Sequence, residues 1–173
     1  MSNMKDKVNF SAPAGWRCDQ RRKKIYVDLE NGSGGSSAVC ANQEFIRQLV
    51  LRLREQYSAQ VTFSVGPTAL SSCPNLIWDW SFARFIPGRG LDGADLALLG
   101  AIQNEPFQET TDSLILISGD HIFAEQSAAL ELMGIPTTVI SHRHALSNQL
   151  KKVASNIQYL PEFQTLLVPR RTA

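Results

Sequence analysis

Cysteine, charge imbalance and long apolar runs are all scarce in this chain of 173 residues. Its three cysteines, Cys18, Cys40 and Cys73, are far apart and form no C-x-x-C pair, which argues against a disulfide framework or a zinc knuckle. A reducing, cytoplasmic setting fits that pattern. We expect no membrane association, because no apolar run reaches the roughly 18 residues that a membrane span needs. The polar start of the chain also lacks the apolar centre of a secretory signal.

The balance of charge gives the chain no general attraction to polyanions. Seventeen basic and sixteen acidic residues leave a formal net charge of +1, so nucleic acid would have to be bound by a local basic patch. Candidate patches contain Arg17 and Arg21 to Lys24, Arg84 and Arg89, and Lys151, Lys152, Arg170 and Arg171. Each of these groups could equally be a solvated face of the protein.

Short apolar runs alternate with longer amphipathic ones, a pattern typical of parallel strands joined by helical crossovers. The expected strands are Lys24 to Leu29, Gln60 to Val65, Asn75 to Ser81, Ser113 to Ser118, Pro136 to Ile140 and a short edge strand at Asn156 to Leu160. The expected helices are Asn42 to Tyr57, Leu91 to Gln103, Ala124 to Met133 and about Ala145 to Ala154. The sequence thus predicts an α/β fold, a three-layer sandwich with a mainly parallel sheet of about five strands. One domain is expected over residues 23–162, between a flexible lead-in (1–22) and a tail (163–173).

Carboxylates follow two of the predicted strands. Asp28 closes the first strand and Asp120 follows the strand "LILIS", so both are expected at the carboxyl edge of the sheet, where such folds bind ligands. Asp95, near the start of a predicted helix, would bring a third carboxylate to that edge. Like charges this close favour a divalent cation, and oxygen ligands without a His or Cys cluster favour Mg²⁺ or Mn²⁺.

Structural roles compete with this interpretation. Asp92 is expected to be the N-cap of the helix that contains Asp95, while Asp28 and Asp120 could be turn or helix-start residues. The loop "GSGGSS" after Asn31 lacks the Lys of a Walker loop and does not match G-x-G-x-x-G, so we interpret it as a mobile loop or a connector.

The aromatic and histidine residues are expected to be structural too. Trp78 and Trp80 alternate as core residues of a strand would. The spacing of His121, His142 and His144 matches no common metal site.

Four segments together resemble the NYN domains of the PIN-like nuclease superfamily: "IYVDLEN", "GADLAL", "LISGDHIF" and "LELMGIPTTVIS". The resemblance implies a PIN-like, Rossmann-like fold and an endoribonuclease that hydrolyses RNA phosphodiesters with Mg²⁺ or Mn²⁺. It implies Asp28, Asn31, Asp95 and Asp120 as the site, with the three aspartates as metal ligands. Arg84, Arg89 and His121 are the residues expected to contact substrate. Two departures from the family are Ile122, where a second acid is common, and Asp92, where a basic residue is common.

Two alternatives remain open at this point. The segment "VDLENG" also resembles the start of haloacid-dehalogenase phosphatases, in which Asp28 would be the covalent nucleophile. That family expects an acid two residues later that is Asp, where this chain has Glu30, and a Lys between the acidic motifs that this chain lacks. The second alternative is a module that binds RNA or a protein partner without cleaving, since Ile122 removes one metal ligand. A homo-oligomer is also compatible with the sequence.

Overall fold

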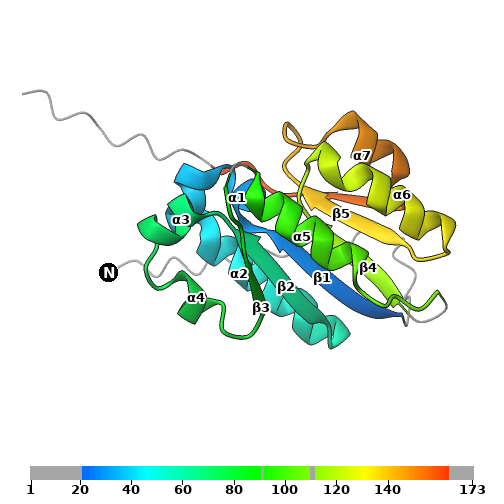
Figure 1. Ribbon diagram of the computed structural model, residues 1–173, viewed down its shortest axis with the longest axis horizontal. Helices are drawn as coiled ribbons and strands as arrows, with labels where there is room; N and C mark the ends of the chain where they lie inside the picture. Colours follow the sequence, from blue (N-terminus) through cyan, green and yellow to red (C-terminus); the bar gives the residue numbers. More distant parts are fainter. Residues whose placement is uncertain (1–20, 91, 110–111, 164–173) are drawn as a thin grey trace, which may run out of the picture.

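The computed structural model describes residues 21–163 except residues 91, 110 and 111, and its centre is a single parallel β-sheet (Figure 1). The predicted lead-in and tail lie almost entirely outside the described residues. Strand β1 (Arg22–Asp28) begins one residue before the predicted start of the domain.

Six strands form this sheet in the order β3-β2-β1-β4-β5-β6, and every neighbouring pair is parallel. Besides β1, they are β2 (Gln60–Val65), β3 (Arg84–Pro87), β4 (Asp112–Ile117), β5 (Thr137–Ser141) and β6 (Asn156–Tyr159). The central strand β4 is buried along its whole length, which requires helices on both faces of the sheet. The predicted α/β class and the largely parallel sheet are therefore confirmed.

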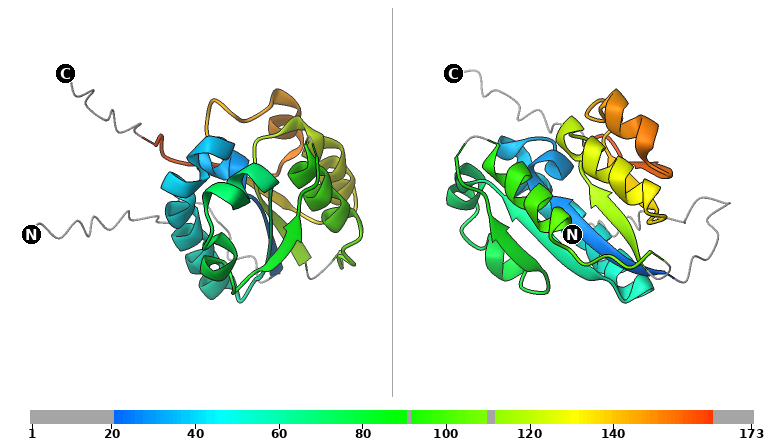
Figure 2. Two further views of the ribbon diagram at one scale, coloured as in Figure 1. Left: turned by 60° about the vertical axis from the view of Figure 1, so that its left-hand side comes forward. Right: turned by 45° about the vertical axis from the view of Figure 1, so that its right-hand side comes forward.

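Helices cover the two faces of the sheet as separate layers, which Figure 2 shows from two sides. One layer contains α1 (Leu29–Ser33), α2 (Val39–Tyr57), α3 (Pro67–Ser72) and α4 (Leu76–Asp79). The opposite layer contains α5 (Gly93–Gln103), α6 (Ala124–Leu132) and α7 (Asn148–Val153). Short 3₁₀ helices at Ser36–Ala38 and His121–Phe123 precede α2 and α6.

Alternation along β1 divides the core between these two layers. Ile25 and Val27 belong to the cluster under α2, whereas Tyr26 between them belongs to the cluster under α5, α6 and α7. Because side chains alternate along a strand, Asp28 lies on the same face as Tyr26, the α5 face.

The prediction of a strand at Asn75 to Ser81 is wrong, because this segment contains helix α4. Trp80 is buried and packs against Phe63 with ring centroids 5.0 Å apart, while Trp78 is 80% exposed. The interpretation of Trp80 as a core residue thus holds, but that of Trp78 does not. The third strand is instead β3, a short edge strand that ends in Pro87, and the segment "GPTALSSCP" contains the short helix α3.

Cys40 and Cys73 form a disulfide that joins the first turn of α2 to the C-cap of α3. The cysteine spacing argued against a disulfide framework, and this disulfide departs from that expectation. Cys18 lies outside the described residues. The pair could not be predicted from the sequence, because the two cysteines are 33 residues apart. They meet only because the chain after β2 brings α3 back to the start of α2. Among the described residues, no helix combines the length and apolar character needed to cross a membrane.

Candidate functional site

The chain reverses its direction of strand addition between β1 and β4, and this point defines the candidate site. From β1 the chain adds β2 and β3 on one side, and it then crosses through α5 to place β4 on the other side. In open parallel sheets the loops diverge at such a switch point and leave a crevice at the carboxyl ends of the strands. Asp28 ends β1 at this edge, and Ser118 follows the last residue of β4.

Asp28 is almost completely buried and has hydrogen bonds on both carboxyl oxygens. The backbone N–H of Asn31 donates to Oδ1 over 3.1 Å, and the Ser118 hydroxyl donates to Oδ2 over 2.8 Å. The first bond makes Asp28 the N-cap of α1, one of the structural roles considered for it. Its side chain also shares a hydrogen bond with that of Asp95.

Asp95 reaches Asp28 because the first turn of α5 lies directly against the end of β3. Gly88, just after β3, packs so closely on α5 that a Cβ there would lie 2.5 Å from the backbone nitrogen of Ala94. Any side chain at position 88 would push the helix start outward. The glycine thus places Asp95 at the carboxyl edge, although Asp95 belongs to a crossover helix and not to a strand end.

Burial first, and then the charge of Asp95, raise the pKa of Asp28 to about 8. Burial likewise raises the pKa of Asp95, and the charges of Asp120 and Asp92 add to that rise, while the hydrogen bond from Asp28 opposes it. A hydrogen bond between two carboxyl groups requires a proton on one of them, so the pair retains a proton at neutral pH.

Glu30 belongs to the same electrostatic group. Burial and the charge of Asp95 raise its pKa, while a hydrogen bond from the backbone of Gly66, just after β2, lowers it. Asp95 thus interacts with each of the other acids, and we call the five the acidic cluster: Asp28, Glu30, Asp92, Asp95 and Asp120.

We expected Asp120 to lie beside Asp28, because it follows the end of the neighbouring strand. Asp120 is not the residue that contacts Asp28. The residue adjacent to Asp28 is Ser118, whose oxygen also accepts the backbone N–H of Asp120 over 3.2 Å. Asp120 caps the 3₁₀ helix through the N–H of Ile122 and pairs with the exposed ring of His121, 2.9 Å away. This pairing occupies one oxygen of Asp120, a predicted metal ligand, with His121, a residue predicted to contact substrate.

Asn31 connects the two sides of the crevice. Its Oδ1 accepts the backbone N–H of Gly119 over 2.9 Å, which fixes α1 to the turn that follows β4. Gly119 is packed against the carbonyl of Ala145 and the hydroxyl of Ser141, so no side chain fits there. Asn31 therefore has a structural role that was not expected from the sequence.

The predicted capping role of Asp92 is wrong. Asp92 occupies the N-cap position of α5, but its backbone is left-handed with φ of 52°, and its side chain makes no capping hydrogen bond. A side-chain cap requires an extended backbone at this position, which Asp92 does not have. Its carboxylate acts on Asp95 through charge.

No three His, Cys, Asp or Glu side chains within the described ranges are arranged as a ready metal-binding group. The buried ring of His142 donates to the carbonyl of Gly32 over 2.9 Å and stacks on His144. The donor chemistry at the edge is nevertheless that of a hard cation, because carboxylate, hydroxyl and amide oxygens meet there. The donor set therefore fits Mg²⁺ or Mn²⁺ in chemistry, with two carboxyl groups already in contact.

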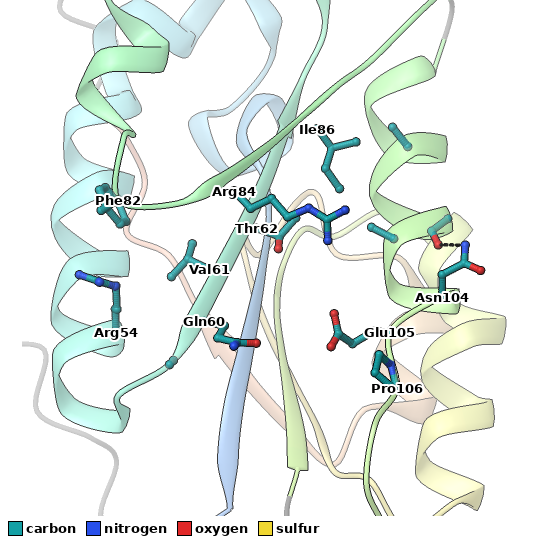
Figure 3. Close-up of a pocket in the computed structure, with 14 residues that line it drawn as sticks. Arg54, Gln60, Val61, Thr62, Phe82, Arg84, Ile86, Asn104, Glu105 and Pro106 are labelled. Carbon is teal, nitrogen blue, oxygen red and sulfur yellow. Dashed lines mark hydrogen bonds between the residues drawn. The ribbon is translucent and has the colours of Figure 1, made fainter.

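Arg84 and Arg89 both lie on the β3 side of the acidic cluster and are exposed. Arg84 faces a groove of about 860 Å³ between strands β2 and β3 and helix α5 (Figure 3). We call it the α5 groove; its lining includes Thr62, Arg84, Ile86, Ala97, Gly100 and Asn104. Arg89 lies in the loop between β3 and α5.

Two participants in this site were not assigned a role from the sequence. Ser118 is the direct neighbour of Asp28, and the α5 groove extends the site along the sheet. The signal for Ser118 was its place in "LISGD", immediately after the apolar run. The groove gave no signal, because it depends on how far apart α5 and β3 lie.

Comparison with known proteins supports the fold and no more. No protein-family model matches the chain, and no curated protein matches it. Three chains of solved structures match, among them a protein of unknown function from Vibrio parahaemolyticus RIMD 2210633. That structure has 16% sequence identity and a TM-score of 0.53, covering 84% of this chain and 97% of its own.

Proposed function

We propose that this protein is a metal-dependent endoribonuclease of the PIN-like type, with an NYN-like site at the acidic cluster. The observation that carries the proposal is the hydrogen-bonded pair of Asp28 and Asp95 at the switch point of the sheet. A buried pair of acids retains a proton when no cation is present, and a divalent ion would replace that proton. The raised pKa of Asp28 supports this interpretation.

Asp28, Asp95 and Asp120 are the residues that would hold Mg²⁺ or Mn²⁺. Asp120 has a side chain that is 34% exposed, and it would have to leave His121 to join the buried pair. When bound, such an ion lowers the pKa of a water molecule and stabilises negative charge on a phosphate.

The other residues of the site would hold it in shape. Ser118 and the backbone N–H of Asn31 keep Asp28 oriented toward Asp95 by hydrogen bonds to its two oxygens. Because Oδ1 of Asn31 is used by Gly119, the proposed role of Asn31 in orienting a water or the scissile phosphate falls to its Nδ2 group. His121, Arg89 and Arg84 would contact the phosphates on either side.

Cleavage of end-labelled single-stranded and structured RNAs by the purified full chain in Mn²⁺ or Mg²⁺ tests this function. We expect cleavage that EDTA abolishes and that Asp120→Asn reduces at least tenfold. Asp79→Asn, an equal charge change on the distant helix α4, is the matched control and should cleave normally. Absence of cleavage, or cleavage that persists in both EDTA and the Asp120→Asn variant, would refute the proposal.

A non-cleaving RNA-binding module is the second candidate, and one observation favours it. The described residues contain no assembled group of three metal-ligand side chains, and Ile122 stands where the related nucleases often have a further acid. RNA binding that weakens steeply with salt, together with no detectable cleavage in Mn²⁺, would support this candidate over the nuclease.

The burial of Asp28 counts against the phosphatase alternative. A covalent nucleophile needs a free oxygen facing its substrate, but Asp28 is 2% exposed and both of its oxygens accept hydrogen bonds. Failure to hydrolyse a generic aryl phosphate would remove this alternative.

RNA is the partner that the proposed function requires. A protein partner, a second copy of the chain and a cytoplasmic location remain predictions from the sequence. Size-exclusion chromatography with light scattering tests the oligomeric state.

A further inference from the structure

We propose that the α5 groove binds a single strand of RNA that continues from the acidic cluster, so that the protein holds several nucleotides on one side of the position where it acts. This inference rests on the proposed function for the identity of its ligand. It goes beyond that function by assigning a binding site, the side of the acidic cluster on which the RNA lies, and a preference for single-stranded RNA.

The groove begins where the acidic cluster ends. Strand register places Asp28, Ser64 and Ile86 in one row across β1, β2 and β3, and Ile86 lines the groove. On the opposite wall, Asp95 is in the first turn of α5, and Ala97, one of the next residues of that helix, also lines the groove. An RNA strand that leaves the acidic cluster on this side would therefore enter the groove directly.

The length of the groove suits a short run of nucleotides. Its α5 wall runs from Ala97 to Asn104, which is about 10 Å at a rise of about 1.5 Å per residue. Stacked nucleotides advance about 3.4 Å each, so about three of them span this wall. The groove continues past Asn104 to Glu105 and Pro106.

Small residues give the groove its depth. Ala97, Gly100 and Ala101 form the α5 wall, and a Cβ added to Gly100 would have no neighbouring atom within 4 Å. This space lies between one helix and the edge of one sheet, and its polar groups lie on the walls. Single strands suit such a site, because their unstacked bases can offer hydrogen-bonding edges that a duplex hides.

Arg84 provides the contact that selects a polyanion. Figure 3 shows its side chain in the groove between Thr62 and α5, and among the described residues its guanidinium forms no ion pair or hydrogen bond. The acid at the far end of the groove, Glu105, is already bound by Lys24 and by the hydroxyl of Tyr26. The charge of Arg84 also acts on Glu105, but the direct contacts of that carboxylate are made by Lys24 and Tyr26. The exposed guanidinium of Arg84 can therefore contact a phosphate.

Hydrogen-bonding groups that suit base edges line the same surface. Gln60 and Asn104 carry amides and Thr62 carries a hydroxyl, all on the walls of the groove. The groove ends at Phe82 and Arg54, where the guanidinium lies 5.8 Å from the ring centroid. Amides and hydroxyls pair with several bases, so we expect a preference for single-stranded RNA with weak dependence on sequence.

Binding of fluorescein-labelled oligouridylates of 2, 4, 8 and 12 nucleotides, followed by anisotropy in EDTA, tests the inference without requiring cleavage. We expect the affinity of the full chain to rise at least tenfold from the 2-mer, which cannot fill the groove, to the 12-mer. Gly100→Trp should fill the groove and lower the 12-mer affinity at least tenfold. Leu132→Trp, an equally large apolar side chain at an exposed position on α6, is its control and should bind normally.

Arg84→Gln provides a second variant that leaves the shape of the groove unchanged. It should lower the 12-mer affinity about tenfold and reduce the slope of log affinity against log salt by about 1, because one phosphate contact is lost. Arg52→Gln on α2, outside the lining of the groove, is the matched control and should retain both values. Normal binding by both Gly100→Trp and Arg84→Gln would overturn the inference, as would equal affinity for the 2-mer and the 12-mer.

The results for the groove and for the nuclease can be separated. Cleavage in Mn²⁺ combined with normal RNA binding by both groove variants would support the proposed nuclease activity and refute RNA binding in the α5 groove. Loss of binding in both groove variants, in a protein that never cleaves, would support the groove and refute the nuclease.

Discussion

Asp28 makes the stability of the metal-free protein depend on pH. Its pKa is raised to about 8 by burial and by Asp95, whereas an unfolded aspartate has a pKa of about 3.9. Between these values the folded state binds a proton that the unfolded state releases. The free energy of unfolding should therefore fall as the pH rises from about 4 to about 8.

Thermal melting in EDTA from pH 5 to pH 8.5 measures this dependence. Asp28→Asn should flatten the fall in melting temperature and make the protein more stable than wild type at pH 8. An equal fall in both proteins would show that Asp28 carries no raised pKa.

Asp92 is strained by its backbone and should tolerate glycine better than alanine. Its φ of 52° places an L-residue in the left-handed region without a capping bond to compensate. We expect Asp92→Gly to be more stable than Asp92→Ala by about 1 kcal/mol in urea unfolding. The opposite order would contradict a left-handed backbone at Asp92.

Two glycines should respond to alanine in opposite directions. Gly119→Ala places a methyl group against the Ala145 carbonyl and the Ser141 hydroxyl and should destabilise by about 1–3 kcal/mol. Gly100→Ala adds a methyl group in open space within α5 and should stabilise by about 0.5–1 kcal/mol. Chemical denaturation of the two variants, with wild type as reference, measures both values, and a destabilising Gly100→Ala would contradict the open space described at that position.

At the scale of elements, the disulfide is the clearest target. Cys40–Cys73 closes a loop of 33 residues that contains most of α2, all of β2 and α3. Breaking it should lower the free energy of unfolding by about 2–4 kcal/mol, because the unfolded chain regains the freedom of that loop. The double variant Cys40→Ser with Cys73→Ser, compared with wild type in the absence and presence of reductant, measures this change. An effect of reductant on the double variant would point to another cause.

The elements that the sequence predicted correctly are those with a strong period or long buried run. The apolar strands β1, β2 and β4 and the amphipathic helix α2 needed no tertiary information. The segment "NLIWDWS" misled because its alternating tryptophans fit a strand, although burial of Trp80 against Phe63 is achieved from a helix end. Strand β3 was missed because it is short, half-exposed and defined by pairing with β2.

The site was predictable in its location and not in its contacts. Strand ends in a parallel sheet meet at one edge, so Asp28 and the residues after β4 were expected together. The contact between Asp28 and Asp95 depends on the close packing of Gly88 against α5, and the separation of Asp28 from Asp120 depends on Ser118. Neither follows from periodicity, because each is decided by side-chain packing between distant segments.

For the whole molecule, our proposals place the metal at the acidic cluster and the RNA strand in the α5 groove, which lies on the β3 side of the sheet. Because the formal net charge is only +1, the proposed RNA binding would depend on this local surface, with Arg84 and Arg89 as its cations. The central claim is that the acids Asp28 and Asp95 form the core of a divalent metal site.

Calorimetric titration of Mn²⁺ into the full-length protein at pH 7.5 is the most direct test. We predict binding that is weakened at least tenfold by Asp28→Asn and by Asp95→Asn, together with release of a proton from the buried pair in the wild type. Asp79→Asn, on the other face of the sheet, should bind Mn²⁺ as the wild type does. Absence of Mn²⁺ binding, or equal binding by Asp28→Asn, Asp95→Asn and wild type, would contradict the claim that the acidic cluster is a metal site.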